Sequence, residues 1–149
     1  MPGPCFYLIW ILGCQRSLAE DNSWGMALQE GKLKGALILV VEDEPLIALD
    51  ISSSLEDAGA QVLHAASVES ALAQLDQHAC SAAVLDSWLG AESGRAVARR
   101  LKQQGIPFLY YSGRTLDEFT SGSGVPVLAK PAGGREIVGM LRLLLDGKA

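Results

Sequence analysis

The sequence has few charged and few aromatic residues, no basic run and no long apolar run. Only 19% of its 149 residues are charged, and the formal net charge is −5. An acidic chain without a basic run is a poor candidate for direct nucleic-acid binding. No apolar run approaches the roughly 20 residues that a transmembrane helix needs, so we expect no membrane span. With 49% hydrophobic residues, the chain has instead the composition of a globular protein.

Cysteines are also few, and none is paired in the sequence. Cys5, Cys14 and Cys80 are scattered along the chain and form no CxxC pattern. This spacing indicates reduced thiols, as in a cytosolic protein, rather than a disulfide framework. We therefore expect a cytoplasmic location.

The chain divides into an N-terminal extension and one domain. Residues 1–34 combine an apolar arm at 6–12 with a polar linker. The arm resembles a short export signal, but no Lys or Arg precedes it, and a secretory signal normally begins with positive charge. We interpret the extension as an arm that packs on a neighbour or as a translated upstream stretch, with Met26 as an alternative start. Residues 35–149 have the length of one domain with one core.

From Gly35 onward, apolar runs alternate with amphipathic stretches. Runs with the length of buried strands lie at 36–41, 81–85, 107–111 and 125–129, and a short strand is plausible at 61–65. Helical spacing predicts helices over 45–58, from Ser67 to about Leu75, over about 92–104, and over about 134–146. This alternation predicts an α/β fold, a doubly wound parallel sheet with helices on both faces. Between 113 and 124 only Thr115–Thr120 has helical character, so we expect a short or irregular fourth helix there.

Four of these runs end in polar residues that carry chemistry. These residues are Glu42 and Asp43, Asp86, Ser112, and Lys130. Ligands of open α/β sheets bind outside the carboxyl ends of the strands, so these side chains should meet in one crevice. Carboxylates about 4 Å apart repel by roughly 4 kcal/mol per pair at an effective dielectric near 20, so the cluster needs a proton or a cation. Mg²⁺ accepts few carboxylates and bridges to phosphate oxygens. The pattern predicts a site for a divalent cation and a phosphoryl group.

Taken in order, these strand ends resemble the signature of one family. The segments Val41-Glu42-Asp43-Glu44-Pro45, Leu85-Asp86, Tyr111-Ser112-Gly113 and Lys130-Pro131 look like those of response-regulator receiver domains, the CheY-like superfamily. The resemblance covers about 35–146. It implies a single-domain receiver with a flavodoxin-like, five-stranded parallel sheet of order 2-1-3-4-5.

The resemblance also implies a role for each site residue. Asp86 would be the phosphoacceptor, and Ser112 and Lys130 would each bind a phosphoryl oxygen. Asp43 and Asp86 would ligate Mg²⁺. Glu42 would assist through water, and the backbone carbonyl of Trp88 would be a further ligand. In this family the Lys130–Pro131 bond is typically cis, which X–Pro bonds tolerate best.

The implied function is that of a single-domain response regulator in two-component signalling. A histidine kinase would donate the phosphoryl group in a Mg²⁺-dependent reaction that the domain itself catalyses, as it does the later loss to water. The signal would pass to a downstream protein partner or by onward phosphotransfer. The alternative is a pseudo-receiver that docks partners without phosphorylation. Val127 keeps this alternative open, because relatives carry at this position an aromatic residue that rotates on activation.

One further alternative is an enzyme, and two histidines remain to be interpreted. A phosphatase-type hydrolase would need a second catalytic acid near Asp86, but position 88 is Trp. The isolated His64 and His78 have no partner pattern, and we interpret both as surface residues.

Overall fold

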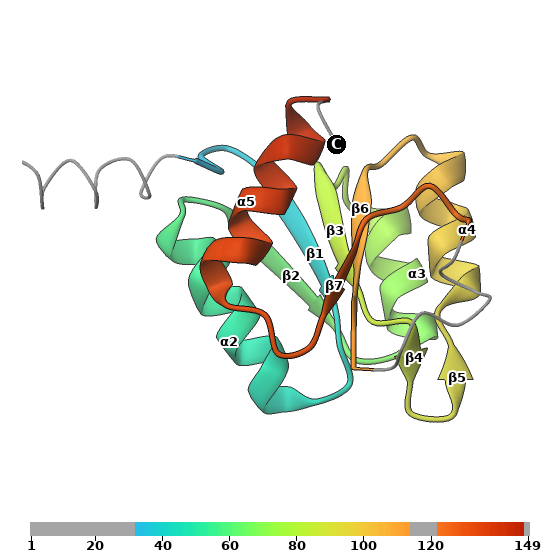
Figure 1. The fold of residues 1–149 in the computed structure, drawn as a ribbon. Helices are drawn as coiled ribbons and strands as arrows, with labels where there is room; N and C mark the ends of the chain where they lie inside the picture. The colour runs from blue at the N-terminus through green and yellow to red at the C-terminus, as the bar shows by residue number, and fades with distance from the viewer. Residues whose placement is uncertain (1–31, 114–121, 148–149) are drawn as a thin grey trace, which may run out of the picture.

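The computed structural model describes residues 32–113 and 122–147 (Figure 1). Its main feature is one parallel five-stranded sheet in the order β2-β1-β3-β6-β7. The strands are β1 (Leu37–Val41), β2 (Gln61–Ala65), β3 (Ala82–Leu85), β6 (Phe108–Ser112) and β7 (Val127–Ala129). Numbered along the chain as strands one to five, this is the order 2-1-3-4-5. The predicted doubly wound α/β fold is therefore confirmed.

Helices cover both faces of the sheet. Figure 1 shows α2 (Pro45–Asp57) and α5 (Gly134–Leu145) on one side, and α3 (Val68–Gln77) and α4 (Arg95–Gln103) on the other. Within the described ranges, no helix is long and apolar enough to cross a membrane. Because both faces are covered, strands β1, β3 and β6 read in sequence as continuous apolar runs rather than as alternating ones.

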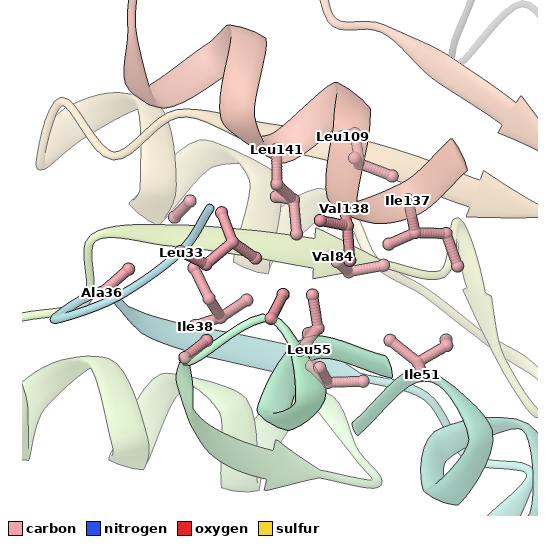
Figure 2. Packing of buried hydrophobic residues seen from close by; sticks show 14 of the residues in the cluster. Leu33, Ala36, Ile38, Ile51, Leu55, Val84, Leu109, Ile137, Val138 and Leu141 are labelled. Atoms are coloured by element: carbon pink, nitrogen blue, oxygen red, sulfur yellow. The ribbon is translucent and has the colours of Figure 1, made fainter. Parts of the chain in front are cut away.

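The core consists of two clusters of buried side chains, one on each face. Under α2 and α5, alternate strand residues such as Ile38 and Val84 pack against Leu55 and Leu141 (Figure 2). The intervening strand residues point to the opposite face and pack under α3 and α4. Leu33 belongs to the first cluster although it precedes the predicted domain boundary, and it is buried. Each fully buried Leu or Ile stabilises the fold by about 1.5–3 kcal/mol.

Local sequence explains where the helices begin. Pro45 stands at the first position of α2, where the missing N–H costs nothing. Ser67 caps α3: its Oγ accepts the Ser70 N–H at 3.1 Å, and the Ser70 Oγ accepts the Ser67 N–H at 3.2 Å. This reciprocal pair satisfies two donors that the first helical turn leaves open.

The structure corrects the start of the third predicted helix. We expected it to begin at about Glu92, but Glu92–Ser93 forms strand β5, which pairs antiparallel with β4 (Trp88–Leu89). Helix α4 begins only at Arg95. The reason is a tight turn at Gly90, whose φ of +63° favours glycine, and which folds the chain into a hairpin before the helix. The short helix expected at Thr115–Thr120 lies outside the described residues.

The close approach of α5 to α2 gives a test of this packing. A Cβ atom on Gly134 would lie 2.1 Å from Ser54 Oγ and 2.6 Å from Ser54 Cβ, and rotating the Ser54 hydroxyl cannot relieve the second contact. We expect Gly134→Ala to lower the free energy of unfolding by about 1–3 kcal/mol. The control is Gly139→Ala in the same helix, where an added Cβ meets nothing within 4 Å. That change should raise stability by about 0.5–1 kcal/mol. Chemical denaturation measures both, and equal effects would contradict the clash.

Candidate functional site

Three carboxylates lie together at the carboxyl ends of β1 and β3. Glu42 and Asp43 directly follow β1, and Asp86 directly follows β3. One oxygen from each of the three lies within 4.8 Å of the others. Glu42 and Asp86 are buried, with 2% and 8% of their surface exposed, whereas Asp43 is exposed. The structure therefore brings together the three acids that the sequence predicted, and solvent reaches them from the side of Asp43.

Lys130 brings a positive charge to this cluster from the end of β7. Its Nζ donates a hydrogen bond to Glu42 Oε2 at 2.6 Å and another to Asp86 Oδ2 at 3.0 Å. The Lys130 backbone N–H donates to the Ser112 carbonyl oxygen at 2.9 Å, which extends the pairing of β7 with β6. The Lys130–Pro131 peptide bond is cis, as the family resemblance implied.

Burial and charge set the protonation of these groups. Burial lowers the pKa of Lys130, but the hydrogen bonds to Glu42 and Asp86 and the charges of these carboxylates together outweigh it, so the pKa lies above its ordinary value. Burial raises the pKa of Glu42, and the nearby Asp86 charge adds to this, although the bond from Lys130 opposes both. With all groups ionised, three carboxylates and one ammonium leave a formal charge of −2. This excess favours a divalent cation.

The oxygen donors fit Mg²⁺, which is a hard cation that takes oxygen ligands. Both oxygens of Glu42 already accept hydrogen bonds, Oε1 from the Glu44 N–H at 3.2 Å and Oε2 from Lys130. Asp43 Oδ2 accepts from the Gly90 N–H at 2.9 Å, and Asp86 Oδ1 from the Trp88 N–H at 3.3 Å. Backbone groups of the β4–β5 hairpin thus orient the two aspartates. The metal-binding role of the Trp88 carbonyl stays a prediction.

Ser112, the predicted hydroxyl residue, ends β6 and is paired with a residue that the sequence analysis missed. Its Oγ lies 2.8 Å from Ser87 Oγ, and both side chains are buried. Ser87 directly follows Asp86. The parallel register places Leu85 opposite Tyr110, and two more residues in each strand place Ser87 opposite Ser112. This register could have predicted the pairing of Ser87 with Ser112, but it can be derived only when β3 and β6 are known to be neighbours.

Two other residues hold the backbone of the site and were also missed. His64 is exposed, as expected of a surface residue, but its Nε2 also forms a hydrogen bond of 3.0 Å with the Glu42 carbonyl oxygen. Gly94 donates its N–H to the Ser87 carbonyl oxygen at 2.9 Å. A Cβ on Gly94 would lie 2.8 Å from the Asp86 carbonyl oxygen, so only glycine fits at this position without a shift of the backbone.

Tyr111 supports the loop that carries Lys130. Its hydroxyl accepts the Ala132 N–H at 3.1 Å and donates to the Ala132 carbonyl oxygen at 3.3 Å. Its ring centroid lies 5.3 Å from Lys130 Nζ, which allows a cation–π contact. The residue therefore fixes the chain two positions after Lys130 and lines the approach of the ammonium.

We predict that Tyr111→Phe keeps the ring contact and releases this loop. Removing the hydroxyl leaves two polar backbone groups of Ala132 without their partner, so the free energy of unfolding should fall by about 1–3 kcal/mol. Amide hydrogen exchange should become faster at Ala132. The Gly90 amide, which donates to Asp43 on the other side of the site, should keep its relative protection. An unchanged exchange rate at Ala132 would show that the hydroxyl does not hold the loop.

Comparisons with known proteins agree with this geometry. Residues 38–142 match the family model described as the response regulator receiver domain. A response regulator receiver protein from Sinorhizobium medicae WSM419 is 27% identical, with a TM-score of 0.70 over 78% of this chain and 99% of that chain. A CheY-like receiver domain protein from Methanospirillum hungatei JF-1 is 24% identical, with a TM-score of 0.69 over 76% and 95%.

A longer protein is also similar. The response regulator PhyR from Brucella abortus is 23% identical, with a TM-score of 0.71 over 90% of this chain but only 57% of its own length. A sequence comparison with curated proteins finds no match.

Proposed function

Because the chain belongs to the response regulator receiver domain family, we propose that it receives a phosphoryl group on Asp86 during two-component signalling. The observation that carries this proposal is the contact of Lys130 Nζ with Asp86 Oδ2, beside the carboxylates of Glu42 and Asp43. A nucleophilic carboxylate, a cation for the transferred group and a set of metal ligands thus lie at one edge of the sheet. Phosphoryl transfer requires positioning and charge neutralisation more than other chemistry.

The proposed reaction is a transfer from a phosphohistidine of the kinase. An oxygen of Asp86 attacks phosphorus, the P–O bond forms as the P–N bond breaks, and the histidine nitrogen keeps the electron pair and takes up a proton. Lys130 pairs with one phosphoryl oxygen, and Ser112 donates a hydrogen bond to another. Bound Mg²⁺ would neutralise negative charge on the phosphoryl oxygens. Its proposed ligands are Asp43, Asp86 and the Trp88 carbonyl, with Glu42 acting through water.

The proposed partners are a histidine kinase and a downstream protein or phosphotransfer protein. The phosphoryl group finally leaves by hydrolysis, which the same residues assist, so the protein catalyses only its own modification and its reversal. We place this exchange in the cytoplasm. The free, buried thiol of Cys80 is compatible with that reducing compartment.

One observation favours a second candidate, a receiver that docks partners without phosphorylation. Val127 stands opposite Tyr110 in the pairing of β7 with β6, and an aliphatic side chain cannot make the aromatic rotation that the resemblance implied. Against this candidate, the described site keeps its acids, hydroxyl and lysine together. The two candidates differ in whether the chain takes up a phosphoryl group.

We predict that acetyl phosphate and Mg²⁺ add one phosphoryl group to the wild-type protein, as read by intact mass, and that EDTA prevents the addition. The physical reason is that the transferred group needs a carboxylate nucleophile and a cation to offset the cluster's negative charge. The matched variant is Asp86→Asn, which preserves shape but lacks the nucleophile, and it should gain no mass. An equal gain in this variant would exclude Asp86 as the acceptor, and no gain in the wild type would favour the docking candidate.

We also predict that Mg²⁺ stabilises the protein through Asp43. A ligand that binds only the native state stabilises it by RT ln(1 + [L]/Kd), which is about 2.7 kcal/mol at a hundredfold excess over Kd. The melting temperature of the wild type should therefore rise with Mg²⁺, and that of Asp43→Asn should rise much less. Asp50→Asn is the control, since it removes the same charge from an exposed position on α2. If all three proteins respond equally, Asp43 is not a ligand.

A further inference from the structure

We propose that Ser87 is a positioning residue that orients the Ser112 hydroxyl to donate its proton to the phosphoryl group on Asp86. The inference rests on the proposed function and adds a residue to it. Its starting point is the buried contact of 2.8 Å between the two Oγ atoms. Ser87 is 1% exposed and Ser112 is 5% exposed, so water does not readily replace either partner.

The number of protons decides the direction of this hydrogen bond. A serine hydroxyl has one proton to donate and two lone pairs that accept. Within the part of the chain that the structure describes, Ser112 Oγ is the partner observed for the Ser87 hydroxyl. If Ser87 only accepted, its own proton would be buried without an acceptor, at a cost of about 1–3 kcal/mol. Ser87 therefore donates, and Ser112 accepts.

In this direction Ser112 donates its own proton to a group other than Ser87, and in the phosphorylated protein that group would be a phosphoryl oxygen. With one lone pair occupied by Ser87, the Ser112 hydroxyl has fewer orientations, and its oxygen is held at the edge of the sheet where Asp86 lies. A hydroxyl that accepts one hydrogen bond also becomes a better donor of the next, and the second bond is strengthened by about 10–30%. The pair thus forms a short relay from Ser87 through Ser112 to the phosphoryl oxygen.

Ser87 is also fixed in place by its own backbone. Its carbonyl oxygen accepts the Gly94 N–H at 2.9 Å, and the adjacent Asp86 N–H donates to the Val41 carbonyl oxygen at 3.0 Å. The acceptor aspartate and the positioning serine are consecutive residues on this anchored segment. The backbone directly after β3 therefore fixes Asp86 and Ser87 relative to each other, and Ser112 meets them from the end of β6.

The test is a double-mutant cycle on the affinity for beryllofluoride, a phosphoryl mimic, measured by calorimetry with Mg²⁺ present. One hydrogen bond contributes about 1 kcal/mol, so Ser87→Ala should weaken binding by about three- to tenfold. Ser112→Ala should weaken it at least as much. In the Ser112→Ala background, Ser87→Ala should have no further effect, because the relay has already lost its second member. Ser87→Cys, which keeps the size and a weak donor, should give an intermediate affinity.

The outcomes separate this inference from the function on which it rests. Unchanged or tighter binding by Ser87→Ala would overturn the relay alone. So would an equal loss in both backgrounds, which is what a merely structural role of Ser87 would produce. If the wild type does not bind beryllofluoride, or if Asp86→Asn binds it equally well, the proposed function fails and the relay fails with it.

Discussion

The ammonium of Lys130 between the carboxylates of Glu42 and Asp86 is the interaction on which the site depends. It joins the ends of three strands, β1, β3 and β7, that are far apart in the sequence. A buried charge that loses its partner costs about 3–5 kcal/mol, so each of these groups needs the others in the folded protein. The same arrangement is one positive charge short of balancing Asp86 and Glu42, and Asp43 adds a further negative charge. The fold thus holds a site with excess negative charge, which favours a cation.

A second constraint is the tight backbone around Asp86. Gly94 lies so close to the Asp86 carbonyl oxygen that a side chain there would collide with it, and the hairpin that precedes Gly94 gives its N–H groups to Asp43 and Asp86. A backbone N–H that holds a carboxylate is already fixed by the fold, so the donor loses no side-chain entropy when the hydrogen bond forms. Asp86 is therefore positioned by main-chain geometry, while Ser112 and Lys130 approach it from the ends of β6 and β7.

Local sequence predicted the regular elements better than the connection after Asp86. Strands β1, β3 and β6 were readable because both faces of the sheet are covered there, which makes each of them an apolar run. The start of α3 could be predicted because the side chains of Ser67 and Ser70 each accept the backbone N–H of the other. Residues 92–94 were misread as the start of a helix, because they belong to a hairpin that is held by the turn at Gly90 and by the contact of Gly90 with the distant Asp43, which no local pattern contains.

The sequence by itself determined that Glu42, Asp43, Asp86, Ser112 and Lys130 would gather at one edge of a parallel sheet. The reason is that each of these residues ends or directly follows an apolar run that is recognisable in the local sequence, and the carboxyl ends of parallel strands all lie at the same edge of the sheet. Only the tertiary structure decided that Lys130 bridges Glu42 and Asp86, that Tyr111 holds Ala132, and that Ser87 pairs with Ser112. These contacts join residues that are 21 to 88 positions apart. They depend on strand order and register, which the packing of the whole core sets.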